Sequence, residues 1–227
     1  MNTSVLIYSC DKYSDVWGSF FTLLFRYWDC PYQVYVVAET EQCLIPEVKT
    51  INVEEDAWTD KIRTAVEQIP TEYVICMCED FFMRRMVRQD VIDDCIGQME
   101  KNPSIACFNF EKEYDWVLPS PYAGFGRKPD NGAYRLSCQP TLWRRDILTE
   151  LLKGSRSAWE WELSSRSAPN EYEYYIWTGS EDDLVFEYGY HDNQWFGIRK
   201  GKWVARDVVP LFERENIDVD FSIRGFV

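Results

Sequence analysis

The stretch Tyr73–Cys78 constrains the fold of this chain more than any other part of the sequence. It is an unbroken apolar run, and it stops on two acids, Glu79 and Asp80. Such a run predicts a strand buried on both faces, as in the centre of a mostly parallel α/β sheet. Charges are costly to bury, and ligands of open α/β sheets bind at the carboxyl ends of strands, so the two acids mark a candidate ligand site. The alternative is a pair of solvated acids at a strand–loop junction.

The first forty residues predict a βαβ unit with a right-handed crossover. Ser4–Ser9 and Gln33–Ala38 are expected strands, and a helix between them carries an i, i+3, i+4, i+7 apolar stripe from Trp17 to Leu24. Asp11 follows the first strand, where it either contacts a ligand or is a plain loop residue. Further strands are expected at 48–53, 105–110, 134–139 and 172–177, helices at 59–68, 91–101 and 141–153, and a hairpin turning near Lys200-Gly201.

Charge and cysteine content exclude several classes of protein. The net charge of −14 argues against nucleic acid as a partner, because binding phosphates requires Lys and Arg. The eight cysteines contain no Cys-x-x-Cys pair, which argues against a zinc site. No stretch approaches the roughly 20 apolar residues of a membrane span, and no signal peptide is evident, so we expect a cytoplasmic, reduced protein. A basic cluster at Arg84, Arg85 and Arg88 either binds phosphate or neutralises the acids that begin the next helix.

The central segment resembles the core of GT-A-type glycosyltransferases, through the motifs Trp58-x-Asp60-x-x-Arg63, Glu72-Tyr73-Val74 and Glu79-Asp80-Phe81-Phe82. In that family an acidic motif at a strand end holds a divalent metal on the diphosphate of a sugar nucleotide. The resemblance therefore implies Mg²⁺ or Mn²⁺ on Asp80 and Glu79. Cys78 stands where the family has its first acid, so strict metal dependence does not follow. The resemblance also implies that Asp11, Asp60 and Arg63 line the donor pocket; a surface salt bridge is the other interpretation of Arg63.

A second segment, 134–167, is similar to bacterial polysaccharide glycosyltransferases in Arg135-Leu136-Ser137 and in the Trp-x-aromatic-Glu pattern of 159–162. An inverting transferase needs a carboxylate near the acceptor hydroxyl. The resemblance matches Glu162 to that position, with Glu160 as second choice. Residues two apart on a helix point to nearly opposite sides, so only one of the two acids can face the site. The flanking tryptophans offer rings for stacking on an acceptor sugar.

Together these features predict a single α/β domain over 1–227 with a GT-A-like (Rossmann-like) mixed, mostly parallel sheet flanked by helices. Residues 1–110 would bind the nucleotide sugar, and 111–227 would face the acceptor. The segment 111–133, rich in Pro, Gly and Tyr, is expected to be an irregular lid. The implied function is transfer of a sugar from a nucleoside diphosphate to a saccharide or glycolipid hydroxyl in surface polysaccharide synthesis. The alternative is a non-catalytic carbohydrate- or nucleotide-binding domain that assists a partner enzyme.

Overall fold

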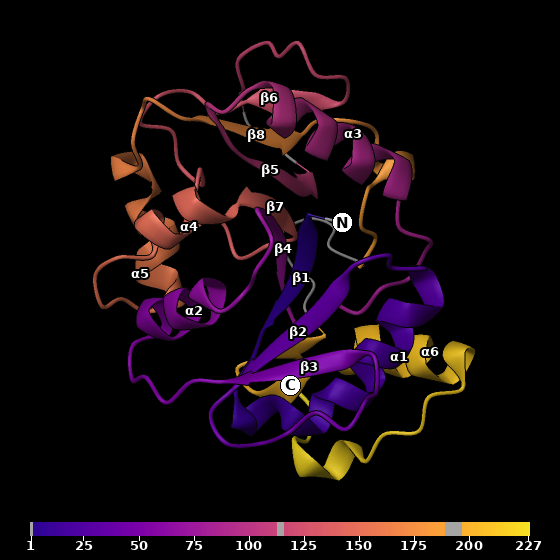
Figure 1. The fold of residues 1–227 in the computed structure, drawn as a ribbon. Coiled ribbons are helices and arrows are strands. Elements are labelled where there is room, and N and C mark those ends of the chain that lie inside the picture. Colours follow the sequence, from indigo (N-terminus) through magenta and orange to yellow (C-terminus); the bar gives the residue numbers. More distant parts are fainter. Residues whose placement is uncertain (1, 113–115, 189–196) are drawn as a thin grey trace.

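The computed structural model describes residues 2–112, 116–188 and 197–227, and its centre is a twisted eight-stranded sheet (Figure 1). The strands are β1 Thr3–Tyr8, β2 Gln33–Ala38, β3 Val48–Asn52, β4 Tyr73–Cys78, β5 Ile105–Lys112, β6 Phe125–Arg127, β7 Thr141–Arg144 and β8 Glu173–Trp177, with a separate hairpin of β9 Ile198–Arg199 and β10 Lys202–Trp203. The α-helices are α1 Trp17–Tyr27, α2 Trp58–Glu67, α3 Gln89–Lys101, α4 Arg145–Leu151, α5 Ala158–Leu163 and α6 Ala205–Glu215. Short 3₁₀ helices are η1 Asp11–Val16, η2 Ser164–Ser167, η3 Glu181–Asp183 and η4 Phe221–Ile223.

The strand order is β3-β2-β1-β4-β7-β5-β8-β6. The first four strands of the chain are parallel, β7 runs antiparallel between β4 and β5, and β6 is antiparallel to β8 at the edge. In the β1–β4 pair the register places Tyr8 opposite Cys78, so these two strands end level with each other. The residues that follow these strands, including Asp11 and the Glu79–Asp80 pair, therefore lie at the same end of the sheet, where β1 and β4 have their carboxyl ends.

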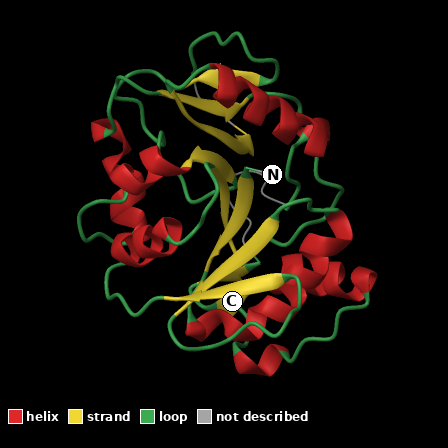
Figure 2. Cartoon of the chain, in the orientation of Figure 1, coloured by secondary structure: helices red, strands yellow, loops and turns green. Residues whose placement is uncertain are grey.

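Helices cover both faces of the sheet (Figure 2). The larger core packs α1, α3 and α6 against one face, with Phe20, Ile92 and Phe212 buried among strand residues. The smaller core packs α2, α4 and α5 against the other, around Trp143 and Trp161. The predicted mixed, mostly parallel α/β architecture is confirmed. No helix in the described ranges is long and apolar enough to cross a membrane.

Three sequence predictions about local structure were wrong. The expected strand 134–139 is a loop, and the expected helix 141–153 begins instead with strand β7. Thr141–Arg144 is extended because it fills the place between β4 and β5, where cross-strand pairing outweighs helix propensity. The tail 208–227, expected to be short mixed structure, instead begins inside helix α6, which continues to Glu215 with Pro210 within it.

The hairpin prediction is confirmed: Lys200 and Gly201 both have positive φ, as a two-residue β turn of the primed type requires. Segment 111–133, expected to be irregular, contains β6 and so extends the sheet. Within it, residues 113–115 lie outside the described part of the chain. So does His191, the one histidine of the sequence.

Candidate active site at the ends of the central strands

Glu79 and Asp80 are the first residues after β4, at the centre of the sheet. Glu79 is only 7% exposed, and its carboxylate accepts a hydrogen bond from the Ser9 hydroxyl at 3.1 Å. The indole N–H of buried Trp17 in turn donates to the Ser9 oxygen at 2.8 Å. The first residue after β1 and the first residue of α1 thus orient the acid at the end of β4.

Burial raises the pKa of Glu79, and the neighbouring charge of Asp80 raises it further. Burial likewise raises the pKa of Asp80, while the guanidinium of Arg224 opposes the shift in both acids. Two adjacent carboxylates in a poorly solvated place disfavour each other's charge, and a cation placed beside them favours it. A cation beside the pair would therefore offset the repulsion between the two carboxylates.

Arg224 reaches this edge of the sheet from the C-terminal tail, 209 residues from its partner Asp15. Its guanidinium makes two hydrogen bonds to the Asp15 carboxylate, at 2.8 and 2.5 Å, and a third to the carbonyl of Lys12 at 2.8 Å. It also lies 4.2 Å from the centre of the Tyr13 ring. The sequence offered no signal for this contact, because only the fold brings the tail onto η1.

Carboxylate oxygens are the ligands that Mg²⁺ and Mn²⁺ prefer. Glu79 and Asp80 therefore suit such an ion chemically. In the described part of the chain, however, no three Asp, Glu, Cys or His side chains converge as a complete metal site. The thiol of Cys78 donates to the carbonyl of Cys138 at 3.6 Å, so it is engaged elsewhere. The Glu79–Asp80 pair would thus suit a cation that has two carboxylate ligands from the protein and takes its other ligands from a bound anion.

Glu162, on α5, is linked to the end of β4 through Cys138, whose carbonyl accepts from the Cys78 thiol. Its carboxylate accepts a hydrogen bond from the backbone N–H of Cys138 at 2.7 Å. Burial raises the pKa of Glu162, against the effect of that hydrogen bond. The pKa of the Cys78 thiol is raised first by burial and then by the charges of Cys138, Asp80, Glu79 and Glu162, so both sets of acids influence this thiol.

Glu111 is a further acid of this region that the sequence analysis did not single out. It lies in β5 and is half-buried. Burial, followed by the charge of Glu162, raises its pKa to about 7, while Lys128 opposes the shift. Its position just after the apolar run 105–110 is the same signal that identified Asp80, and it was available in the sequence.

Glu160 and Glu162 have different roles on the short helix α5. Glu160 closes a capping box with Ser157: its carboxylate accepts from the Ser157 N–H at 2.8 Å, and the Ser157 hydroxyl accepts from the Glu160 N–H. Trp161 is fully buried, and its indole donates to the carbonyl of Leu151 at 2.9 Å. Of the two tryptophans expected to stack on a sugar, only Trp159 is open to solvent.

Asp11 lies at the expected edge of the sheet, but its oxygens are already engaged. They accept hydrogen bonds from the backbone N–H groups of Glu39, Thr40 and Glu41, at 2.9 to 3.1 Å, and from the Thr40 hydroxyl at 2.6 Å. Burial raises the pKa of Asp11, but these hydrogen bonds outweigh it and hold the pKa at about 2. The carboxylate organises the loop that follows β2.

Asp60 and Arg63 lie on the first turns of α2. Asp60 accepts from the Ser155 hydroxyl at 2.5 Å, and Arg63 contacts Glu67 at 2.9 Å and Asp60 at 3.7 Å. This pairing matches the salt-bridge interpretation of Arg63, and the donor-binding role of both residues stays a prediction.

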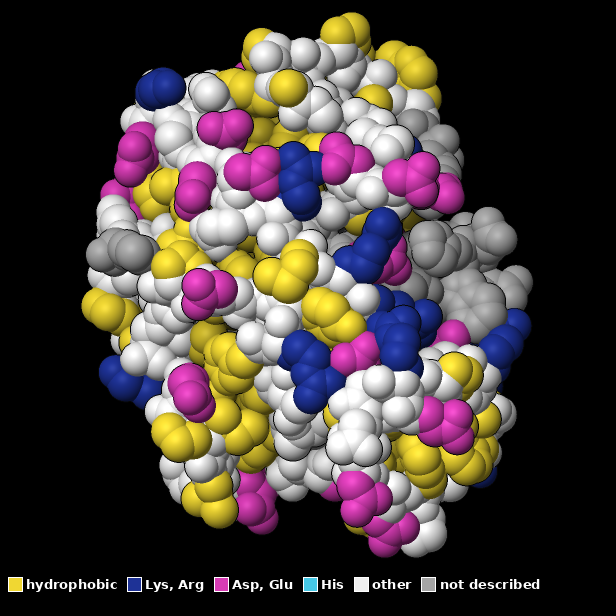
Figure 3. Space-filling model, turned by 90° about the vertical axis from the view of Figure 1, so that its right-hand side faces the viewer, with side chains coloured by type: hydrophobic (Ala, Val, Ile, Leu, Met, Phe, Trp, Pro, Cys, Tyr) yellow, Lys and Arg dark blue, Asp and Glu magenta, His cyan; other side chains and the backbone are white. Residues whose placement is uncertain are grey.

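The basic cluster at Arg84, Arg85 and Arg88 is paired with acids. Figure 3 shows Lys and Arg side chains gathered among acidic ones on this face of the molecule. Arg85 contacts Glu187 at 2.9 Å, and Arg84 lies 3.9 Å from Asp207. Arg88 contacts Asp90 and Asp183. The Arg88–Asp90 contact fits the second sequence interpretation, neutralisation of the acids that begin the next helix, whereas Arg84 and Arg85 pair with acids far along the chain.

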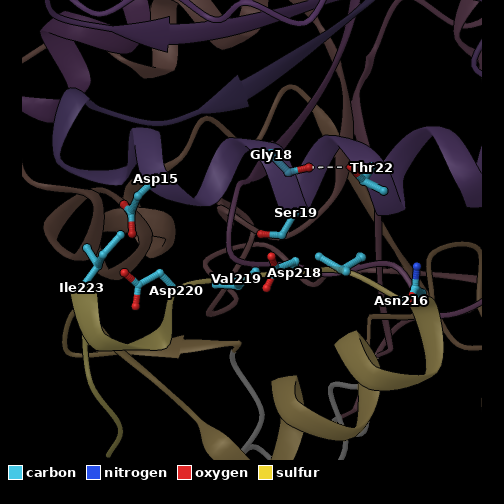
Figure 4. Close-up of a pocket in the computed structure, with 10 residues that line it drawn as sticks. Asp15, Gly18, Ser19, Thr22, Asn216, Asp218, Val219, Asp220 and Ile223 are labelled. Atoms are coloured by element: carbon cyan, nitrogen blue, oxygen red, sulfur yellow. Dashed lines mark hydrogen bonds between the residues drawn. The ribbon is translucent and has the colours of Figure 1, made fainter.

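A hollow of about 420 Å³ lies behind Asp15, between the start of α1 and the C-terminal tail (Figure 4). Two of its three acids are engaged within the protein: Asp15 binds Arg224, and Asp220 accepts from the N–H and hydroxyl of Ser222. Asp218 is the third acid that lines it. Ser19 and Thr22 also line the hollow, and their hydroxyls donate to backbone carbonyls of the preceding turn.

No protein-family model matches the sequence, and no curated protein matches it. Among solved structures, the mannosyltransferase PcManGT from Pyrobaculum calidifontis, in complex with GDP-Man and Mn²⁺, is similar with a TM-score of 0.52 and 13% identity, over 96% of this chain and 65% of that one. Residues 1–349 of TarS from S. aureus, in complex with UDP-GlcNAc, give 0.49 and 13%, over 82% and 60%. A cytidylyltransferase from Leptospira borgpetersenii gives 0.47 and 10%, over 95% of both chains.

The chain spans less than two thirds of the length of both transferase structures. The likeness to the mannosyltransferase shows that this protein has the GT-A-like fold that its sequence predicted.

Proposed function

We propose that this protein is a glycosyltransferase that moves a sugar from a nucleoside diphosphate to a hydroxyl acceptor. The observation that carries the proposal is the Glu79–Asp80 pair, which is desolvated at the end of the central strand of a GT-A-like sheet. Residues 1–110 would supply most of the donor site, and 111–227 the acceptor side. The inverting outcome, the role in surface polysaccharide synthesis and the cytoplasmic location belong to the same proposal.

In this proposal the Glu79 and Asp80 carboxylates would hold Mg²⁺ or Mn²⁺, which when bound would supply positive charge that stabilises the leaving diphosphate. Arg224 adds a fixed positive charge beside the pair, although Asp15 already balances it. Asp60 and Arg63 would contact the nucleotide from the start of α2. The mannosyltransferase of the same fold binds GDP-Man and Mn²⁺, which supports the choice of ligands.

Glu162 is the proposed general base. The acceptor hydroxyl oxygen forms a bond to the anomeric carbon, the bond from that carbon to the diphosphate oxygen breaks, and the hydroxyl proton passes to the Glu162 carboxylate. Burial raises the pKa of Glu162, so its carboxylate takes a proton more readily than an ordinary carboxylate does. Its hydrogen bond to Cys138 orients one oxygen. Glu160 is the weaker candidate because its carboxylate serves the capping box.

A thermal-shift screen of UDP-, GDP-, CMP- and dTDP-sugars, each with and without Mn²⁺, tests the proposal. A ligand at a hundredfold its Kd adds about 2.7 kcal/mol to the free energy of unfolding, which shifts the melting temperature clearly. Turnover is then measured as release of the free nucleotide in the presence of saccharide acceptors. Binding without turnover supports the alternative, a non-catalytic domain that assists a partner, for which Cys78 in the acidic motif is the favouring feature. Binding of none of the donors contradicts the transferase and a nucleotide-binding domain, and leaves the carbohydrate-binding form of the alternative.

A further inference from the structure

Three large apolar side chains are exposed on the two segments that adjoin Glu162, helix α5 and the loop 134–138. Trp159 and Leu163, both on α5, are 72% and 66% exposed, and Tyr134, on the loop before β7, is 50% exposed. Large apolar residues scattered singly on a surface need no explanation, but a group next to a candidate catalytic acid does. We call Trp159, Leu163 and Tyr134 the aromatic platform.

Helix geometry places two members of the platform next to the acid. At about 100° per residue, Trp159 lies roughly 60° from Glu162 around the axis of α5, and Leu163 roughly 100°. Trp161 points into the core on the opposite side of the helix from Leu163 and Trp159. Glu162 therefore lies at the boundary between the buried face and the exposed apolar face.

The loop 134–138 brings the third member alongside. It is attached to α5 and η2 at both ends, because the Tyr134 N–H donates to the Ser165 hydroxyl at 2.8 Å and the Cys138 N–H donates to Glu162 at 2.7 Å. The Glu162 carboxylate is thus flanked by Trp159 on its own helix and by a loop that carries Tyr134.

Tyr134 is held in an unfavourable backbone conformation. Its φ is 53°, in the left-handed region that a bulky residue rarely adopts and that Asn or Gly adopts readily. Strain of this kind persists where surrounding contacts impose it, and it concentrates at functional sites. Here the result is an aromatic side chain kept half-exposed, which gives the protein no core packing in return.

The chemistry of the platform favours a saccharide over a lipid surface. Trp and Tyr combine an apolar ring with a hydrogen-bonding group, which suits the apolar faces and hydroxyls of sugar rings. A membrane-binding helix carries Lys or Arg on its polar face, whereas the six residues of α5, Ala158–Leu163, contain two Glu and no basic residue. A neutral ligand with many hydroxyls matches both the rings and the acids.

We propose that the aromatic platform is the acceptor subsite and that it binds an oligosaccharide longer than one sugar ring. From Trp159 to Leu163 helix α5 rises about 6 Å, and from there to Ser165 the 3₁₀ helix η2 rises about 4 Å more, so the chain here extends about 10 Å, which exceeds a single pyranose. The assignment of Glu162 as base rests on the proposed function, but saccharide binding by the platform does not require it. Trp159 and Tyr134 position the acceptor, and Glu162 meets its hydroxyl.

Saturation-transfer NMR on the full chain, without donor, tests the proposal. The probes are maltotriose, N,N′-diacetylchitobiose and trigalacturonic acid, with glucose as the single-ring comparison. We expect transfer to at least one oligosaccharide, weaker transfer to glucose, and at least a tenfold loss of affinity in Trp159→Ala. Leu44→Ala, which removes an exposed apolar side chain from the loop between β2 and β3, is the control and keeps full affinity; Leu44 is 90% exposed.

Tyr134→Asn separates a binding role from a structural one. Asn tolerates positive φ, so this variant should melt at a higher temperature and yet bind the oligosaccharide more weakly. A variant that melts higher with unchanged binding removes Tyr134 from the subsite.

Transfer to none of the probes, or equal affinity in Trp159→Ala and wild type, overturns the proposal. Binding to phosphatidylglycerol vesicles that is lost in Trp159→Ala, with no saccharide bound, replaces it with a lipid surface. Donor binding in the thermal-shift screen is read independently, so failure of the platform and failure of the transferase assignment are distinguishable.

Discussion

The carboxyl ends of β1 and β4 lie side by side, and each is followed by acids, but the acids are in opposite states. Asp11 after β1 accepts four hydrogen bonds from the 39–41 loop, and its pKa is held at about 2. Glu79 after β4 has one hydrogen bond from another side chain, that of Ser9, and both it and Asp80 have raised pKa values. A carboxylate whose lone pairs are filled by its own protein is structural, whereas a desolvated pair with few donors favours an added cation.

The same contrast recurs within one turn of α5. Glu160 is exposed and engaged in the capping box, which lowers its pKa through the hydrogen bonds from Ser157. Glu162, two residues later, is half-buried with a raised pKa. Position in the strand–loop or helix pattern is therefore a weaker guide to function than the number of donors that the fold supplies to each acid.

The largest effect is expected for Glu162→Gln. Positioned bases contribute roughly 10²–10⁴-fold to rate, so this variant should lose that factor in kcat while donor binding by thermal shift persists. Glu160→Gln, two residues away on the same helix, is the matched control. It should keep its turnover and lose about 1 kcal/mol or less of stability through the weakened cap. Loss of turnover in Glu160→Gln instead, with Glu162→Gln fully active, would reverse the contrast within α5.

The next effect is on metal-linked donor binding. Asp80→Asn should abolish the part of the donor stabilisation that depends on Mn²⁺, out of a total of about 2.7 kcal/mol for a donor at a hundredfold its Kd. Without ligand, the variant should be as stable as the wild type or more so, because one of two mutually repelling carboxylates is removed. If wild type and Asp80→Asn have equal donor affinities, both with and without chelator, then Asp80 has a structural role like that of Asp11.

Asp11→Asn should show the reverse pattern. The hydrogen bonds to its charged oxygens are worth about 1.5–3 kcal/mol each to break, and the amide retains only part of them, so we expect a loss of about 1–3 kcal/mol in the free energy of unfolding. Urea unfolding measures it. Donor affinity of the folded variant should be nearly unchanged; a selective fall in donor affinity at constant stability would instead support the donor-binding role that the resemblance implies.

Local elements of this fold were predictable from the sequence, whereas contacts between distant parts of the chain were not. Strand β4, which ends just before Glu79, was predictable because its six consecutive residues are apolar. The hairpin at Lys200-Gly201 was also predictable. The strand Thr141–Arg144 was not, because its pairing partners lie far along the chain. For the same reason Arg224 could not be placed beside the acids before the fold was known.

The acids themselves illustrate the limit most directly. Asp11 and Asp80 are equivalent in sequence terms, each following a predicted strand at the same sheet edge. Their difference comes from the backbone N–H groups of Glu39, Thr40 and Glu41, which a loop folds around Asp11 and not around Asp80. Sequence patterns locate such acids, but only the tertiary hydrogen bonds show which of them remain available.

The pH dependence of stability should reveal the hydrogen bonds that lower the pKa of Asp11. The pKa of Asp11 is about 2 in the folded protein and about 3.9 in an unfolded chain, so the unfolded state binds more protons between these values. Its stabilising contribution is complete above about pH 4 and is lost as the pH falls toward 2. Urea midpoints from pH 5 to 2 should fall less steeply in Asp11→Asn than in wild type. Parallel slopes for the two proteins would show that the loop hydrogen bonds do not depend on the charge.

The smallest expected effect on stability is that of Arg63→Met. This substitution keeps the aliphatic stem and removes a charge whose partners, Glu67 and Asp60, are on the same helix. Such exposed pairs contribute under about 1 kcal/mol, so the melting temperature should hardly move. Donor affinity is the informative measurement, because an arginine at the start of the helix beside β4 either meets the nucleotide or only its helical neighbours. A weaker donor affinity at constant stability extends the ligand site from the end of β4 to α2; an unchanged affinity places Arg63 with Asp11, among the charged groups that the fold has already satisfied.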